Sequence, residues 1–270
     1  MNDLQQKEFN LLKIFIKICE QLGLRYYLVC GTALGAVKYG GFIPWDDDVD
    51  IALCRNDYKV FCEKAQQLLP EGIFLQTYET DRRYPCVFAK LRDSNTTYIE
   101  KTYKNISMNH GVYIDIFPLD GCPEDMNLQK RLERKKLFYK LLISSVYESN
   151  CSFKVKVLRR VFRILGVHKR THRILCKFEK MISSYPTENS AFWCNYGNWQ
   201  GRLEYAPKEQ YGEGTLMNFE GISVSVPERY DEYLTQKYGD WKADPPEDDQ
   251  VGHHYFSIMD LNNSYTQYMK

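Results

Sequence analysis

The sequence predicts an α+β protein in which a mixed sheet is flanked by helices. Residues 4–22 carry apolar side chains at spacings of three and four, which is typical of an amphipathic helix, and Gly23 follows as a natural stop. Short apolar, β-rich runs at 25–30, 49–53 and 112–117 predict strands. A chain of 270 residues has room for one large domain or two small ones, and we expect one globular unit.

The remaining elements follow from turn residues and periodicity. Asn56 or Asp57 is expected to cap a helix that ends before Pro70, and Pro118 with an Asp120-Gly121 turn is expected to end the strand at 112–117. Further helices are expected at 33–39, 57–69 and about 228–238, and further strands at 73–78, 84–92, 96–100 and 222–226.

Charge is distributed unevenly along the chain. The whole chain has a net charge of +1 and 44% hydrophobic residues, which is ordinary for a globular protein. Between 123 and 183, however, 16 Lys/Arg stand against five acidic residues, so this segment has a charge of +11. Its apolar residues recur at helical spacing, which predicts at least two basic amphipathic helices. We therefore divide the chain into a catalytic core at 1–121, a basic helical insertion at 122–185, and a C-terminal region at 186–270 that packs on the core.

The basic insertion is open to three interpretations. It is a solvated helical surface, a surface that contacts an anionic membrane leaflet, or a nucleic-acid-binding surface. No recognised nucleic-acid motif accompanies the basic residues, so we expect no nucleic-acid partner.

Cysteine usage and the lack of targeting signals bear on location. Nine cysteines are scattered with no C-x-x-C pair, which argues for reduced thiols and against a zinc site. The first residues show neither a basic nor an apolar signal region, and no apolar run approaches the ~20 residues that span a bilayer. We expect a cytoplasmic protein that can lie at the inner face of the cell membrane.

The acidic cluster at 46–50 is the feature that most strongly indicates chemistry. Asp48 and Asp50 are two residues apart and adjoin a predicted strand, so their carboxylates share a face, roughly 6–7 Å apart. Asp115 is a lone carboxylate in another apolar strand and can complete a cluster. Hard oxygen ligands of this kind suit Mg²⁺ or Mn²⁺, and two such ions ~3.5–4 Å apart serve phosphoryl chemistry.

Other residues near the cluster are less specific. An acidic triplet alone is also typical of a solvated turn, and Asp46 and Asp47 are either turn formers or supporting groups behind the ligands. Gly31 and Thr32 stand at a strand-to-helix junction, where free N–H groups favour a phosphate. His110 and the His253-His254 pair are interpreted as hydrogen-bonding residues rather than ligands.

Gly-Thr, Asp-x-Asp and a later strand Asp together resemble the nucleotidyltransferase superfamily, whose core is a polymerase-β-like palm. More narrowly, GTALGAVKYGGFIPWDDDVDIAL at 31–53 is similar to the LicD family of phosphotransferases, which includes the fukutin-type proteins. The stretches at 88–100, 110–121 and 226–254 support this resemblance, which covers most of the chain. No motif is recognised in 123–185.

The resemblance implies a metal-dependent transfer of a phosphorylated alcohol, phosphocholine foremost, from a CDP-activated donor such as CDP-choline. The acceptor would be a sugar hydroxyl of a cell-surface glycan, lipid-linked glycan or teichoic-acid-type precursor, and CMP would leave. Asp48 and Asp50 would hold two Mg²⁺ or Mn²⁺ ions, and Asp115 would be a ligand or the base toward the acceptor. Gly31 and Thr32 would hold the donor pyrophosphate.

Cations and an aromatic residue complete the candidate site. Lys90 and Arg92 are two apart, so they share a strand face and would neutralise phosphate charge, and Lys38 is a weaker candidate of the same kind. The alternative for Lys90 and Arg92 is an exposed strand face. Trp45 would either stack on the cytosine base or brace Pro44.

Two other functions remain open. One is a nucleotidyltransferase that moves NMP from an NTP onto a small molecule. The other is a non-catalytic binding or scaffold module on a degenerate fold, against which the intact trio Asp48, Asp50 and Asp115 argues.

Overall fold

The computed structural model describes residues 1–147, 152–198, 201–252 and 255–269. A seven-stranded mixed sheet lies at its centre and contains β1 (Tyr26–Leu28), β2 (Asp50–Cys54), β3 (Ile73–Gln76), β4 (Ala89–Asp93), β6 (Val112–Cys122), β7 (Phe192–Cys194) and β8 (Tyr205–Pro207). The strand order is β1-β2-β6-β4-β3, while β7 pairs with the end of β6 and β8 pairs with β7. Only the β2–β6 pair is parallel among these. The predicted mixed sheet is confirmed.

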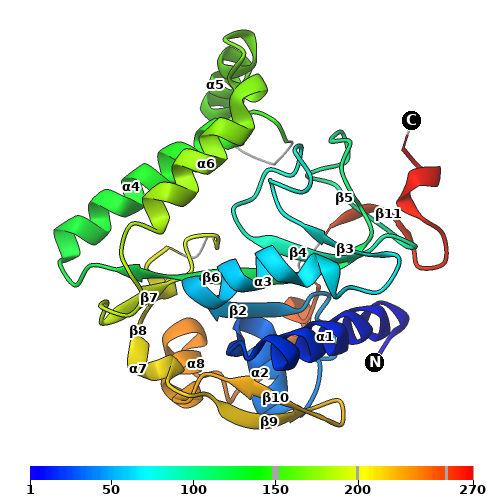
Figure 1. Cartoon of the computed structure of the whole chain (residues 1–270), viewed down its shortest axis with the longest axis vertical. Helices are drawn as coiled ribbons and strands as arrows, with labels where there is room; N and C mark the ends of the chain where they lie inside the picture. The colour runs from blue at the N-terminus through cyan, green and yellow to red at the C-terminus, as the bar shows by residue number, and fades with distance from the viewer. Residues whose placement is uncertain (148–151, 199–200, 253–254, 270) are drawn as a thin grey trace.

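Helices cover this sheet and extend from one end of it (Figure 1). They are α1 (Asp3–Leu22), α2 (Cys30–Lys38), α3 (Arg55–Lys64), α4 (Met126–Ile143), α5 (Phe153–Ile164), α6 (Thr171–Ile182), α7 (Lys208–Tyr211) and α8 (Tyr230–Tyr238). Helices α4 and α6 lie side by side, and α5 lies at their outer end (Figure 1). Two further antiparallel pairs complete the fold, the hairpin of β9 (Thr215–Phe219) with β10 (Ile222–Val226) and the long-range pair of β5 (Thr97–Glu100) with β11 (Phe256–Asp260).

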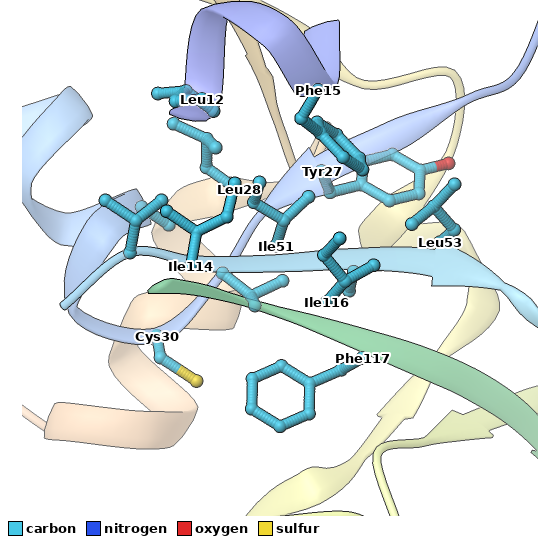
Figure 2. Close-up of a cluster of buried hydrophobic side chains, with 14 of the residues drawn as sticks. Leu12, Phe15, Tyr27, Leu28, Cys30, Ile51, Leu53, Ile114, Ile116 and Phe117 are labelled. Atoms are coloured by element: carbon cyan, nitrogen blue, oxygen red, sulfur yellow. The ribbon is translucent and has the colours of Figure 1, made fainter. Parts of the chain in front are cut away.

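Helix α1 forms as the sequence predicts. Asn2 and Gln5 make a reciprocal capping box at its start, and Gly23 ends it in the left-handed conformation at φ 64°. Its buried side chains Leu12 and Phe15 meet the sheet, where Figure 2 shows them beside Leu28 and Ile51. Burying each such side chain contributes about 1.5–3 kcal/mol. Phe117 lies on the opposite side of the sheet in Figure 2, so the two faces have different surroundings.

Strand β6 is longer than predicted, because Pro118 does not end it. The Asp115 N–H donates to Val49 in the direction of β2, so by alternation the nitrogen of residue 118 faces the other neighbour. On that side β4 pairs with β6 only up to Ile116, so the missing N–H of Pro118 lies beyond the end of this pairing. The predicted Asp120-Gly121 turn is therefore wrong, since both residues pair with β7.

Four other boundaries, those of α3 at both ends and the starts of β4 and α2, differ from prediction. Helix α3 begins at Arg55 without a side-chain cap, because Asp57 instead accepts a hydrogen bond from the Arg25 N–H at 3.2 Å. It ends at Lys64 and continues as a 3₁₀ turn over 65–67. Strand β4 starts at Ala89 rather than 84, and α2 starts at Cys30, so Gly31 and Thr32 lie inside its first turn.

The basic segment forms three helices, in line with the expectation of at least two. Leu132 and Ile143 of α4 and Leu175 and Phe178 of α6 are buried in a second apolar cluster, which also contains Tyr196 from beyond the insertion. The insertion is thus packed into the protein by α4 and α6. Among the described residues, no helix is both long enough and apolar enough to cross a bilayer.

Candidate active site

Three neighbouring strands place predicted site residues in one row. Asp50 of β2 is in register with Asp115 of β6, and Asp115 is in register with Lys90 of β4. Side chains directly opposite each other on neighbouring strands point to the same face. By alternation, Phe117 shares that face, while Ile116 points to the side covered by α1. The sheet therefore presents two carboxylates and an ammonium side by side.

Lys90 compensates the charge of this row. Its Nζ lies 3.0 Å from Asp115 Oδ1 and 3.8 Å from Glu100 Oε2, and the side chain is almost fully buried. The ammonium also lies over the Tyr113 ring, 3.2 Å from its centre. A buried charge persists only with such partners, so the exposed-face alternative for Lys90 is wrong.

A cavity of about 270 Å³ lies over this row. Its charged lining combines residues that come from the strands with one from helix α4: Asp48, Asp50, Lys90, Glu100, Asp115 and Lys140. Much of the remaining wall is aromatic: Phe88, Tyr103, Phe117, Tyr147 and Phe178. Asp48, Asp50 and Asp115 thus line a single cavity, although Asp48 precedes β2 and is not placed there by strand alternation.

The acidic triplet Asp46, Asp47 and Asp48 brings its carboxylates closer together than the predicted trio does. Oxygens of Asp46, Asp47 and Asp48 lie within 4.8 Å of one another, a distance that Asp48, Asp50 and Asp115 as a trio do not meet in the described part of the chain. Burial, followed by the nearby Asp48 carboxylate, raises the pKa of Asp46 to about 8. Carboxylate oxygens this close together are a donor set that fits a hard divalent cation.

The start of α2 is fixed against the acidic residues. The Asp50 N–H donates to Thr32 Oγ1 at 2.8 Å, so the threonine hydrogen remains available to another acceptor. A Cβ on Gly31 would come within 2.9 Å of Asp46 Oδ2, which explains why this position lacks a side chain. Cys30 has φ 52°, a strained value for a residue with a side chain, and its N–H donates to the Tyr233 hydroxyl.

Several predicted or suggested residues lie outside the cavity lining, among them Gly31 and Thr32. Arg92 is fully buried, where it donates to Gln76 and, at 2.6 Å, to the Gly111 carbonyl. Lys38 pairs with Asp244 at 2.7 Å. Trp45 packs edge-on against Tyr39, with 6.2 Å between ring centres. Sequence spacing placed Arg92 on the face of Lys90 but did not show which neighbours would enclose it.

Lys140 also lines the cavity, although no sequence motif predicted it. It comes from α4, and its Nζ donates to the carbonyls of Gly197 and Asn198 at 3.1 and 2.7 Å. Burial, followed by the nearby Lys136, lowers the pKa of Lys140 to about 7. Glu100 is a second unpredicted lining residue, although it lies within the supporting stretch at 88–100.

The histidines are consistent with hydrogen-bonding roles where they are described. His110 is buried, its Nε2 contacts the Ile106 carbonyl at 2.7 Å, and burial lowers its pKa. His253 and His254 lie outside the described residues.

Comparison with known proteins establishes the family of this chain. A family model described as LicD/FKTN/FKRP, nucleotidyltransferase domain, matches residues 23–144. Lipopolysaccharide cholinephosphotransferase LicD of Haemophilus influenzae is 31% identical over 254 residues, which cover 91% of this chain and 92% of that protein. The chain belongs to the LicD family. This LicD-family chain is a phosphotransferase. It also shares 43% identity over 42 residues with ribitol 5-phosphate transferase FKRP of Homo sapiens, which is 16% of this chain and 8% of that protein.

Proposed function

We propose that this enzyme transfers a phosphorylated alcohol, with phosphocholine as the leading candidate, from a CDP-activated donor to a sugar hydroxyl. The acceptor would be a cell-surface glycan or teichoic-acid-type precursor, and CMP would leave. The observation that carries the proposal is the row of Asp50, Asp115 and Lys90 under a cavity that also admits Asp48. The relative named a cholinephosphotransferase, which aligns along nearly the whole chain, supports the same reaction class.

We assign the sheet to the nucleotidyltransferase fold, as the description of the matching family model suggests. Asp48, Asp50 and Asp115 would hold Mg²⁺ or Mn²⁺, with Asp46 and Asp47 beside them. When bound, the ions would neutralise the donor diphosphate and the leaving phosphate. Phosphoryl transfer depends mainly on positioning and charge neutralisation, which this site can supply without a covalent intermediate.

The protein's own groups have separate tasks in this proposal. Lys90 faces the row and would pair with a phosphate oxygen while it holds Asp115 in place at 3.0 Å. Asp115, when it does not ligate metal, would accept the proton of the acceptor hydroxyl. Thr32 would donate its remaining hydrogen to the pyrophosphate. Because Asp46 lies against Gly31, an anion near the start of α2 would need a cation between them.

The aromatic wall favours choline over a polyol as the transferred alcohol. A trimethylammonium group has no hydrogen to donate and binds best to aromatic faces, such as those of Tyr103, Tyr147 and Phe178. Ribitol or glycerol would need hydrogen-bonding partners for each hydroxyl. Lys140 would oppose a cation only in its charged form, and its pKa of about 7 leaves it largely neutral above that pH.

A panel of donors tests the proposal. The purified chain would be incubated with CDP-choline, CDP-ethanolamine, CDP-glycerol, CDP-ribitol, CTP or ATP, with Mg²⁺, Mn²⁺ or EDTA, and thermal unfolding would be followed. We expect CDP-choline to stabilise the protein only with metal, by about 2.7 kcal/mol at a hundredfold excess over its Kd.

Turnover then decides between the functions. With a glycan acceptor, the proposal requires CMP release from CDP-choline. Consumption of CTP or ATP with pyrophosphate release, while CDP-choline is untouched, would establish the nucleotidyltransferase instead. Binding without turnover of any donor would favour the non-catalytic module.

A further inference from the structure

Helix α5 carries an apolar stripe that no part of the described chain covers. None of its residues is buried, and Phe153, Ile164 and the following Leu165 are 81%, 78% and 67% exposed. With 3.6 residues per turn, Phe153, Val157, Val161 and Ile164 fall within about 80° of one another. A continuous stripe of large apolar side chains on a helix surface marks a contact site.

The opposite side of α5 attaches it to the protein. Val155, Leu158 and Phe162 are the half-buried residues of that side. Arg159 Nε donates to Ser144 Oγ at 2.9 Å, and Arg163 Nε donates to the Ser145 carbonyl at 2.7 Å. The helix is therefore held at the end of α4 with its apolar stripe turned outward, at the tip of the α4–α6 pair (Figure 1).

Positive charge adjoins the stripe. Lys156 and Arg160 are exposed along one edge, and Lys154 is exposed along the other. The sequence contains no Asp or Glu from 149 to 178, whereas it contains nine Lys/Arg in that stretch. An apolar stripe flanked by cations is complementary to an anionic lipid surface, where acyl chains meet negatively charged headgroups.

This charge also argues against other occupants. A second copy of α5 would bring two helices with five Lys/Arg each and no acidic residue into contact, so like charges would oppose pairing. A nucleic acid would use the cations but leave the five exposed apolar side chains in water.

We propose that α5 docks the enzyme on an anionic bilayer, with Phe153, Val157, Val161 and Ile164 in the headgroup–acyl boundary. This inference deepens the proposed function, because it names the surface through which the enzyme reaches a lipid-linked glycan acceptor. The docking helix connects directly to the cavity: Arg159 lies 5.7 Å from the centre of the Tyr147 ring, and Tyr147 lines the cavity. Docking would thus hold the cavity close to the membrane.

Vesicle sedimentation of the full chain tests the proposal. Vesicles of phosphatidylglycerol and phosphatidylcholine in equal parts would be compared with pure phosphatidylcholine, without donor or acceptor. We expect binding to the anionic vesicles and an affinity at least about tenfold lower for Phe153→Ser/Ile164→Ser, because two apolar anchors are lost. Leu216→Ser is the matched control, since Leu216 is 73% exposed on β9 and should not affect binding.

Each other outcome has a defined meaning. Equal binding by the double variant and the wild type would overturn the proposal, as would failure of the wild type to bind. A dimer that dissociates in the double variant, seen by analytical ultracentrifugation, would assign the stripe to a second copy instead. Turnover of a CDP-alcohol without vesicle binding would refute this inference alone. Vesicle binding without turnover of any CDP-alcohol would refute only the proposed function. Circular dichroism would confirm that the variants are folded.

Discussion

Strand β6 carries two buried aspartates, five residues apart, whose surroundings differ completely. Asp120 is fully buried on the side of α3, and both of its oxygens accept hydrogen bonds from Arg55, at 2.6 and 2.7 Å. Arg55 also pairs with Glu179 of α6 at 2.9 Å. Asp115 is on the opposite face, contacts one lysine at 3.0 Å and opens into the cavity.

The difference shows which carboxylates of this fold are structural. At Asp120 a planar guanidinium matches both oxygens, so the charge is satisfied by the protein itself. Around Asp115 the cavity gathers Asp48, Asp50 and Glu100 as well, against the two lysines Lys90 and Lys140 of its lining. Carboxylates in excess of their cations require a further positive charge from outside. A lone Asp within an apolar strand therefore indicates a functional site only when its carboxylate lacks a bidentate cation such as the one that Arg55 provides to Asp120.

The largest effect is expected from Asp115→Asn. The amide keeps an oxygen that can accept a hydrogen bond from Lys90 but removes the charge that the proposed metals and proton transfer need. We expect kcat to fall at least about 10³-fold, with the midpoint of thermal unfolding nearly unchanged. CMP release and a thermal melt in EDTA would measure the two quantities. Activity within tenfold of the wild type would remove Asp115 from the site.

Asp120→Asn should show the reverse. It leaves the buried Arg55 without its bidentate partner, although Glu179 still contacts the guanidinium. We expect the free energy of unfolding to fall by about 3 kcal/mol, while kcat of the folded fraction stays close to that of the wild type. Urea denaturation beside a CMP-release assay provides the comparison with Asp115→Asn. If both variants lost activity at unchanged stability, the distinction between the two aspartates would fail.

Lys90→Met probes how much of the excess negative charge the protein compensates. Without the ammonium, Asp115 loses its partner at 3.0 Å, while Glu100 keeps Arg92 at 3.8 Å, so a divalent ion should bind about tenfold more tightly, or 1.4 kcal/mol. Activity should nevertheless fall, because phosphate charge is no longer neutralised. Mg²⁺ titrations followed by thermal unfolding would measure the affinity. Lys38→Met is the matched control, since Lys38 pairs with Asp244 outside the cavity lining; an equal change in that variant would contradict the explanation.

The sequence predicted one half of this comparison and missed the other. Asp48 precedes β2, and the register of Asp50 with Asp115 is a long-range feature of the sheet. Strand alternation is a local rule, so only the directions of Asp50 and Asp115, away from the apolar side chains of their strands, could be predicted. The role of Asp120 could not, because Pro118 was interpreted as the end of the strand. Its missing N–H lies beyond the end of the pairing with β4, and where that pairing ends is known only from the assembled sheet. The prediction from turn residues therefore assigned Asp120 to a surface turn, whereas Asp120 forms a buried ion pair with Arg55.

Long-range packing explains the remaining omissions. Lys140 and Phe178 reach the cavity because α4 and α6 pack over one end of the sheet, and the basic insertion has no motif that announces this contact. Arg92 shows the converse. Its spacing from Lys90 was interpreted correctly as a shared face, yet Gln76 and the Gly111 carbonyl, from distant segments, enclose its guanidinium. Periodicity gives the direction of a side chain, and tertiary contacts decide what it meets.

The remaining prediction concerns Asp46 and the pH dependence of stability. Its pKa is raised from 3.8 to about 8 in the folded protein, so between these values the folded state binds a proton that the unfolded state releases. The free energy of unfolding of the metal-free protein should therefore decline as pH rises from about 4 through about 8. Asp46→Asn should flatten this decline, because the amide resembles the protonated carboxyl. Urea denaturation in EDTA at several pH values would measure it. Saturating Mg²⁺ should also suppress the decline, since a bound cation favours the ionised form. If the free energy of unfolding fell equally with pH in Mg²⁺ and in EDTA, Asp46 would not contribute to the cation site.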